Sequence, residues 1–188
     1  MKNEYWATPI WSWPVDGIDP QDIVAEVQAT RYQDTGRQIS NAGGYQSTAR
    51  PPSRAFEQTQ HLLMAIEQLA ASACQEWGMS RQGRVVSYWV NINGVKDYNT
   101  VHSHPGSQLS GVYYAQAEPG SGDLLFHRNS LADYITGTFG GFTNRYNQSV
   151  IRHQCSPGTM VLFPSELAHS VEANLSGLDR ISVAFNIT

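Results

Sequence analysis

The segment GTMVLFPSELAHSVEANLSGLDRISVAFNI, residues 158–187, indicates the fold class of this chain. It contains three short runs rich in β-branched and other apolar residues, with Pro, Ser, Asn, Gly and Asp between them. Such runs are typical of strands, and the residues between them are those that turns require. We therefore predict strands over 158–164, 168–173 and 180–187.

The same pattern extends back to residue 84, where the character of the chain changes. Short strands without intervening helices indicate a barrel or a sandwich rather than an α/β fold. The chain is therefore predicted to be mainly β. The further predicted strands are 84–93, 109–117, 122–128 and 149–155.

The residues before 84 are predicted to form a short strand over 9–13, two helices and a long loop. Asp19 is a favourable helix cap with a proline directly after it, and the first helix is expected to run towards Thr30. Ser53 is the expected cap of a second helix, whose apolar residues recur at helical spacing as far as Trp77. The Gly- and Pro-rich residues 34–52 form a loop that is either functional or packed across the domain.

The length and composition describe one globular domain. A chain of 188 residues is long enough for one domain and short for two, so we expect a single domain over 1–188. In it, 1–83 would brace a β core over 84–188 that carries the site. The net charge is −4 and Lys and Arg form no block, which disfavours nucleic acid as the main ligand.

The cysteines and the N-terminus indicate a cytoplasmic protein. Cys74 and Cys155 form no disulfide framework and fit a reducing compartment. The first residues lack the apolar segment of a secretory signal. No stretch approaches the roughly 18 apolar residues of a membrane helix. We therefore expect no membrane partner, and the sequence indicates no oligomeric state.

Three histidines form a candidate metal site. His102 and His104 follow a predicted turn over 97–99, and His169 comes from a distant predicted strand. Side chains two residues apart on an extended strand point to the same face, and imidazole is the commonest metal ligand in proteins. An isolated H-x-H pair is equally often a pair of ordinary histidines on a rim, so both interpretations stand on this pattern alone.

Arg180 lies eleven residues after His169, at the start of an apolar predicted strand. One interpretation is a surface arginine paired with Asp179, which would contribute little. The other is a guanidinium fixed inside the barrel, where it would hold a carboxylate by two parallel hydrogen bonds. Ser182 would share its face of the strand.

Residues 89–186 resemble the iron(II)/2-oxoglutarate-dependent oxygenase superfamily, and most closely a small phage and marine-bacterial group of prolyl-hydroxylase-like proteins. The resemblance implies a double-stranded β-helix, or jelly roll, braced by the two N-terminal helices. It is carried by the segments WVNINGVKDYNTVHSHPGSQLSGVYY, GDLLFHR, FPSELAHSVEAN and RISVAFN.

The resemblance implies that His102 and His169 are iron ligands and catalytic residues. His104 stands where the superfamily has an Asp or Glu ligand, and it is a third ligand, a group behind the ligands, or the sign of a degenerate site. We favour the first interpretation, because H-x-H presents both rings to one point. Replacing a carboxylate by a neutral imidazole removes a negative charge and should weaken metal retention.

The same resemblance implies how 2-oxoglutarate is bound. Arg180 falls on the residue that binds its C5 carboxylate, and Arg180 with Ser182 reproduces the R-x-S form of that motif. Tyr114 matches a strand tyrosine that hydrogen-bonds the same carboxylate, although a tyrosine there is equally compatible with the core. Asn91 alternates on a strand that leads into the site and is expected to contact 2-oxoglutarate or substrate.

The implied function is an Fe(II)- and 2-oxoglutarate-dependent dioxygenase. It would take 2-oxoglutarate, O₂ and an unidentified peptidyl or small-molecule substrate, and it would hydroxylate that substrate with release of succinate and CO₂. One alternative is a cupin-type metal enzyme, but Gln108 stands where a cupin has Glu, and 164–166 lacks the cupin P-x-G. The other is a non-enzymatic β-helix binding module. His127 is a weaker candidate for lining the pocket, and 129–148 is a candidate lid.

Overall fold

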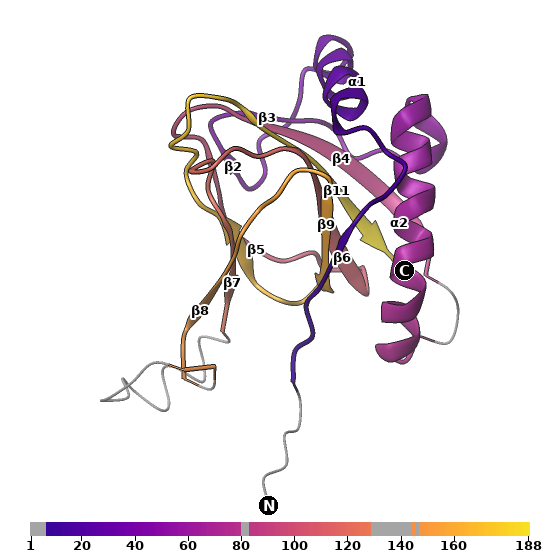
Figure 1. Ribbon diagram of the computed structural model, residues 1–188, viewed down its shortest axis with the longest axis vertical. Coiled ribbons are helices and arrows are strands. Elements are labelled where there is room, and N and C mark those ends of the chain that lie inside the picture. Colours follow the sequence, from indigo (N-terminus) through magenta and orange to yellow (C-terminus); the bar gives the residue numbers. More distant parts are fainter. Residues whose placement is uncertain (1–6, 80–82, 129–143, 146) are drawn as a thin grey trace, which may run out of the picture.

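The computed structural model describes residues 7–79, 83–128, 144–145 and 147–188. Within them, eleven strands and two α-helices are arranged as in Figure 1. In chain order they are β1 (Trp11–Pro14), α1 (Pro20–Gln33), β2 (Asn41–Ala42), β3 (Tyr45–Gln46), α2 (Glu57–Glu76), β4 (Val85–Asn93), β5 (Tyr98–His102), β6 (Leu109–Gln116), β7 (Leu124–His127), β8 (Val150–His153), β9 (Thr159–Pro164), β10 (His169–Val171) and β11 (Arg180–Ile187).

Two antiparallel sheets face each other in these residues. The larger has the strand order β1-β9-β6-β11-β4-β3, and the smaller has the order β2-β5-β10-β7-β8. Neighbours in each sheet come from distant parts of the chain, as in a jelly roll. The predicted mainly β fold, a double-stranded β-helix with two N-terminal helices, is confirmed.

The alternation along β11 separates the helix-facing core from the cavity between the sheets. Both helices lie on the same side of the larger sheet (Figure 1). Apolar residues of α1 and α2 form one core cluster with Ile181, Val183, Phe185 and Ile187. The intervening residues of β11 turn to the opposite side, because strand side chains alternate. A smaller apolar cluster that includes Phe126 lies between the two sheets.

The first helix begins as predicted, and the second does not. Asp19 Oδ1 accepts a hydrogen bond of 2.9 Å from Gln21 N, and α1 continues to Gln33, beyond the predicted end. The predicted cap Ser53 is wrong, because it lies in a 3₁₀ turn before α2. The first amides of α2 are instead bonded by a carboxylate of α1, at 2.7 Å from Thr59 N to Glu26 Oε2. A cap supplied by another helix leaves no local sequence signal.

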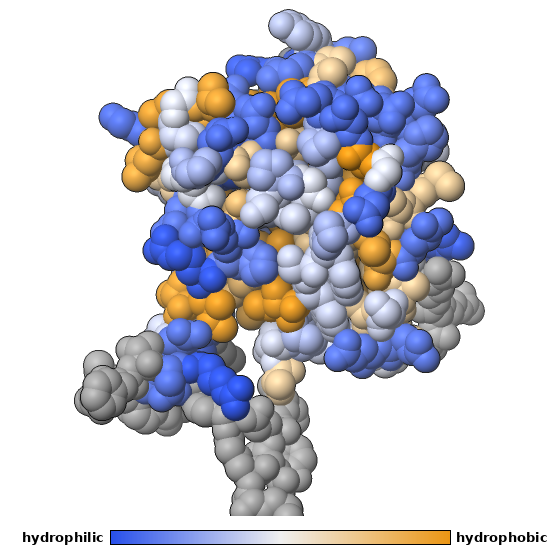
Figure 2. All heavy atoms as spheres, in the orientation of Figure 1, coloured by the Kyte–Doolittle hydropathy of each residue, from blue (hydrophilic) through white to orange (hydrophobic). Residues whose placement is uncertain are grey.

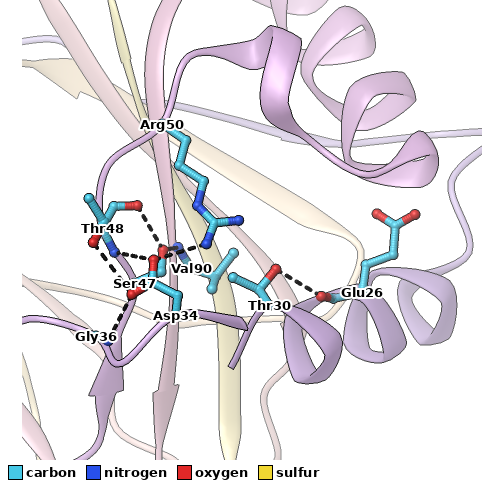
Figure 3. Close-up of polar contacts among 8 residues, drawn as sticks. All are labelled: Glu26, Thr30, Asp34, Gly36, Ser47, Thr48, Arg50 and Val90. Atoms are coloured by element: carbon cyan, nitrogen blue, oxygen red, sulfur yellow. Dashed lines mark hydrogen bonds and ion pairs between the residues drawn. The ribbon is translucent and has the colours of Figure 1, made fainter. Parts of the chain in front are cut away.

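The loop over 34–52 adds an edge strand to each sheet. It contributes β2 and β3, and its end forms an isolated bridge to β4. The carboxylate of Asp34 ties the loop together by accepting hydrogen bonds from Gly36 N (2.7 Å), Thr48 N (3.0 Å) and Arg50 Nη2 (2.9 Å), as Figure 3 shows. The predicted packing across the domain is therefore observed, and Ser40 of the same loop also lines the cavity described below.

The turn predicted over 97–99 is misplaced. The structure puts the turn at residues 95–96, where Lys96 has a φ of 71°, and β5 already begins at Tyr98. Asp97 stabilises this turn, because its Oδ2 accepts a hydrogen bond of 2.8 Å from Gly94 N. As a consequence His102 is the last residue of a strand that was not predicted.

The surface is mainly polar on the face shown in Figure 2, where hydrophobic side chains occur in smaller groups between hydrophilic ones. None of the helices in the described residues combines the length and apolarity needed to cross a membrane.

Candidate functional site

The three predicted histidines meet at one end of the space between the sheets. His102 on β5 and His169 on β10 are directly paired across neighbouring strands. His104 lies two residues beyond the end of β5, so the alternation of side chains along a strand does not by itself place its ring beside that of His102. Its backbone N donates to Ser165 O at 2.9 Å, which turns this loop back towards the sheets. One ring nitrogen of each histidine lies within 4.8 Å of the others.

The imidazoles of His102 and His169 are oriented by backbone carbonyls two residues earlier. Nδ1 of His102 is 2.8 Å from Thr100 O, and Nδ1 of His169 is 2.9 Å from Leu167 O. A carbonyl oxygen only accepts, so each Nδ1 carries the proton and each Nε2 keeps a free lone pair. Both rings therefore have the tautomer that binds metal through Nε2.

Burial keeps all three imidazoles neutral. It lowers the pKa of His102 and of His104, and it lowers the pKa of His169 to about 3, to which the neighbouring His102 makes a smaller contribution. A protonated imidazole has no lone pair to donate, so neutral rings at pH 7 are ready to bind a metal ion. The chemistry of these donors fits a divalent transition metal.

Arg180 occupies the other end of the space, at the start of β11. Its side chain is among the most buried of the described residues, and burial lowers its pKa. Its Nη1 donates to three backbone carbonyls, those of Ser121, Gly122 (3.4 Å) and Glu172 (3.2 Å). Gly122 has a φ of +91°, and a Cβ there would lie 2.8 Å from Nη1, so the close approach requires glycine.

The second terminal nitrogen of Arg180 has no such partner. Nη2 is buried and makes no hydrogen bond, and the described residues place no carboxylate within ion-pair distance of the guanidinium. A buried cation is costly unless it is paired. This nitrogen is therefore a donor that could bind the carboxylate of a ligand.

One cavity joins the two ends. Cross-strand pairs set Asn91, Ser182 and Tyr114 in one row across β4, β11 and β6. The described residues that line the cavity include one arginine and no Asp or Glu. They are Ser40, Trp89, Asn91, Asn93, Asn99, His102, His104, Gly111, Val112, Tyr114, Leu124, Phe163, His169, Val171, Arg180, Ser182 and Ala184.

Two polar groups in this row bear on ligand binding. Oδ1 of Asn91 is buried without a hydrogen-bond partner. The hydroxyl of Tyr114 is fully buried and hydrogen-bonds the sulfur of Cys155, and its burial raises the tyrosine pKa well above 10.0. Tyr114 is therefore a neutral hydroxyl close to a cation.

Other candidates lie elsewhere. His127 does not line the cavity, and its Nε2 lies 2.8 Å from Ser170 Oγ. Gln108, the residue weighed for a cupin site, also lies outside the cavity lining. Most of the candidate lid over 129–148 lies outside the described residues.

Two residues that contact His104 were not predicted from the sequence. The ring of Trp89 lies 5.3 Å from its ring, and Asn186 Oδ1 lies 2.9 Å from its Nδ1. A signal for Asn186 was present, because the alternation in RISVAFN places it on the same face of β11 as Arg180.

The chain matches one family model and many solved structures. The family described as "Putative 2OG-Fe(II) oxygenase" matches residues 87–186. No curated protein matches the chain.

Three of the similar structures show which kinds of protein share this fold. The α-ketoglutarate-dependent carbocyclase SnoK from nogalamycin biosynthesis has a TM-score of 0.70 at 13% identity, over 96% of this chain and 79% of its own. A Pseudomonas putida prolyl-4-hydroxylase has a TM-score of 0.68 at 14% identity, over 95% and 91%. A Trichoplax adhaerens prolyl hydroxylase, in complex with a peptide fragment, has a TM-score of 0.67 at 14% identity, over 95% and 82%.

These similar structures agree with the jelly roll described above, and at such low identity they speak to the fold alone. The family match spans more than half of the chain and includes all three histidines and Arg180. The chain therefore belongs to the 2OG-Fe(II) oxygenase family, and it is a dioxygenase that uses iron and 2-oxoglutarate.

Proposed function

We propose that this dioxygenase hydroxylates a peptidyl or small-molecule substrate, with iron held by His102, His104 and His169. Arg180 would hold the far carboxylate of 2-oxoglutarate. The observation that carries the proposal is one cavity with three neutral imidazoles at one end and a buried guanidinium with a free donor at the other.

The histidine end fits iron(II). Imidazole is a suitable ligand for iron, and three ligands leave further positions open for 2-oxoglutarate and O₂. No described residue in the cavity lining supplies a negative charge. The dianion 2-oxoglutarate would therefore neutralise the metal, and we expect metal and 2-oxoglutarate to strengthen each other's binding.

The arginine end fits a carboxylate. Nη2 of Arg180 has a proton to donate and no acceptor in the described residues. Nη1 is fixed by the backbone, so the guanidinium is oriented before a ligand arrives, and little side-chain entropy is lost on binding. Ser182, Tyr114 and Asn91 supply polar groups along the path between the two ends.

The residues of the chain orient the reactants and exclude water. The chemistry that iron supplies when bound is the activation of O₂, coupled to conversion of 2-oxoglutarate into succinate and CO₂. Arg180 fixes the distance of 2-oxoglutarate from the histidines. Phe163, whose ring lies 4.7 Å from that of His169, and Val171 make the wall beside the histidines apolar.

The substrate class rests on the kinds of protein that share the fold. Two of the similar structures are prolyl hydroxylases, one of them with a peptide fragment, and SnoK is a carbocyclase from nogalamycin biosynthesis. They support a peptidyl or small-molecule substrate, and hydroxylation is the outcome that we propose.

An anaerobic titration tests the proposal. Metal-free protein is loaded with Fe(II), and 2-oxoglutarate is added while the visible spectrum is recorded. We expect a weak metal-to-ligand charge-transfer band that saturates with 2-oxoglutarate. Metal binding that 2-oxoglutarate does not affect would contradict the proposal.

Two alanine variants show whether His104 belongs to the metal site. His104→Ala should weaken Fe(II) binding by more than the roughly 10–100-fold that is typical of groups behind the ligands. His127→Ala is the matched control, because this histidine lies outside the cavity and bonds Ser170. Equal metal affinity in the two variants would remove His104 from the site.

A further inference from the structure

His104 differs from the other two histidines in what holds its imidazole. His102 and His169 each bond a backbone carbonyl two residues earlier. Nδ1 of His104 instead lies 2.9 Å from Oδ1 of Asn186, which is 82 residues further along the chain. A carbonyl is a fixed acceptor, whereas an asparagine side chain presents either an oxygen or an NH₂ group. The orientation of one amide therefore decides whether His104 has a free lone pair on Nε2.

Serine hydroxyls hold that amide from both sides. Asn186 on β11 is directly paired with Ser87 on β4 and with Ser110 on β6. Ser110 Oγ donates to Asn186 Oδ1 at 2.8 Å, and Asn186 Nδ2 donates to Ser87 Oγ at 3.4 Å. This arrangement keeps the amide oxygen towards His104.

The network closes on the loop that carries His104. Ser110 Oγ lies 2.7 Å from Ser165 Oγ, and the carbonyl of Ser165 accepts the hydrogen bond from His104 N. Ser110 and Ser165 are almost completely buried, with exposed fractions of 0% and 1%. Buried hydroxyls are costly unless they are bonded, so this network places both the backbone and the ring of His104.

We propose that Asn186 is a positioning residue that makes position 104 specific for a neutral histidine ligand. This inference rests on the proposed function, because it concerns a metal bound through Nε2. A carboxylate at position 104 has no proton to donate to Asn186 Oδ1 and would set two acceptors against each other. The network therefore suits histidine where other members of the superfamily carry Asp or Glu.

Long-range ¹H–¹⁵N NMR of the metal-free protein tests the first step, since it distinguishes the two neutral tautomers of histidine. The unsubstituted protein should show His104 with its proton on Nδ1. Asn186→Leu has a similar volume and no acceptor, so the proton should move largely to Nε2. Asn186→Asp keeps an acceptor and should restore the Nδ1–H form. An unchanged His104 tautomer in Asn186→Leu would overturn the inference.

Co(II) titration, followed by visible absorption, tests the second step. Asn186→Leu should bind Co(II) roughly 10–100-fold more weakly, and Asn186→Asp should bind within a few-fold of the unsubstituted protein. Asn93→Leu is the matched control, because Asn93 lines the same cavity and its side chain bonds Asn99 rather than a histidine. A loss in Asn93→Leu as large as in Asn186→Leu would also overturn the inference.

Two further measurements distinguish a failure of Asn186→Leu to fold, or a failure of the proposed function, from a failure of this inference. If Asn186→Leu does not fold, Ser110→Ala keeps Asn186 and removes one of its hydroxyl contacts, and it should weaken Co(II) binding in the same direction by less. An unchanged affinity in Ser110→Ala would then overturn the inference. An unsubstituted protein that binds no Co(II) would instead contradict the proposed function, while the tautomer measurement still decides the role of Asn186.

Discussion

Two arginines of this chain are buried to different degrees, and only one of the two forms an ion pair within the described residues. Arg50, in the loop that adds an edge strand to each sheet, is half-buried and forms an ion pair of 2.9 Å with Asp34 (Figure 3). Arg180, in the cavity, is only 2% exposed, and no carboxylate of the described residues pairs with it. The chain thus completes the charge pair where burial is partial and leaves it open where burial is nearly complete.

This difference is the basis for assigning Arg50 a structural role and for proposing a ligand-binding role for Arg180. Pairing Arg50 within the chain fixes the loop, and the pair needs nothing from outside. An unpaired buried guanidinium costs stability, and a ligand anion is the partner that offsets this cost. This cost supports the proposal that Arg180 binds the far carboxylate of 2-oxoglutarate.

The largest expected effect is on ligand binding at Arg180. Arg180→Ala should weaken binding of 2-oxoglutarate by about 3 kcal/mol, roughly 100-fold, and leave Fe(II) binding in its absence unchanged. Arg50→Ala should leave the affinity for 2-oxoglutarate unchanged. Anaerobic calorimetric titration of both variants checks this. Similar losses of 2-oxoglutarate affinity in both would contradict the distinction between the two arginines.

The next effect is on stability at Asp34. Asp34→Asn removes the charge that pairs with Arg50 and should lower the free energy of unfolding by about 2 kcal/mol. Binding of 2-oxoglutarate should persist, because the cavity does not include this cluster. Urea denaturation measures the first quantity. A stability equal to that of the unsubstituted chain would show that the ion pair contributes little.

The Asp34 cluster should also make stability depend on pH. Burial alone would raise the pKa of Asp34, but hydrogen bonds from Gly36 N, Arg50 and Thr48 N outweigh it, so the pKa is lowered. The unfolded chain then binds the proton more readily than the folded one. The contribution is therefore complete above the ordinary carboxyl pKa of about 3.9, and it is lost as the pH falls through the lower folded value. The stability difference between the unsubstituted chain and Asp34→Asn should shrink below about pH 4, and a constant difference would contradict this assignment.

The smallest effect is expected at Tyr114. Tyr114→Phe removes one hydroxyl from the cavity lining and should weaken 2-oxoglutarate binding by about 1 kcal/mol, roughly 5-fold. Tyr113→Phe is the matched control, since its hydroxyl is buried without a partner and its side chain belongs to the helix-facing core. Equal affinities in the two variants would leave Tyr114 as a core aromatic.

The sequence predicted what depends on local pattern. The bounds of β11 are those predicted, because RISVAFNI alternates between the helix-facing core and the cavity and is bounded by turn residues. The start of α1 was also predicted from neighbouring residues, with Asp19 as its cap. The metal-ligand and 2-oxoglutarate roles of the site residues stay proposals, although the structure brings His102, His104, His169 and Arg180 to one cavity.

What the sequence did not predict depends on contacts between distant segments. Glu26 of α1 caps α2, and Asn186 holds His104 across 82 residues. The two-residue strands β2 and β3 are too short for a periodic signal and exist through pairing with β5 and β4. The beginning of β5 was missed because Tyr98 and Asn99 resemble turn residues, whereas Asp97 ends the turn one residue earlier.

An anaerobic crystal structure with Fe(II) and 2-oxoglutarate tests the central claim most directly. We expect Nε2 of His102, His104 and His169 on the iron, and the C5 carboxylate of 2-oxoglutarate on Nη2 of Arg180. An iron held by His102 and His169 alone, with His104 turned away, would contradict the three-histidine site. A 2-oxoglutarate that does not reach Arg180 would contradict the role assigned to the unpaired arginine.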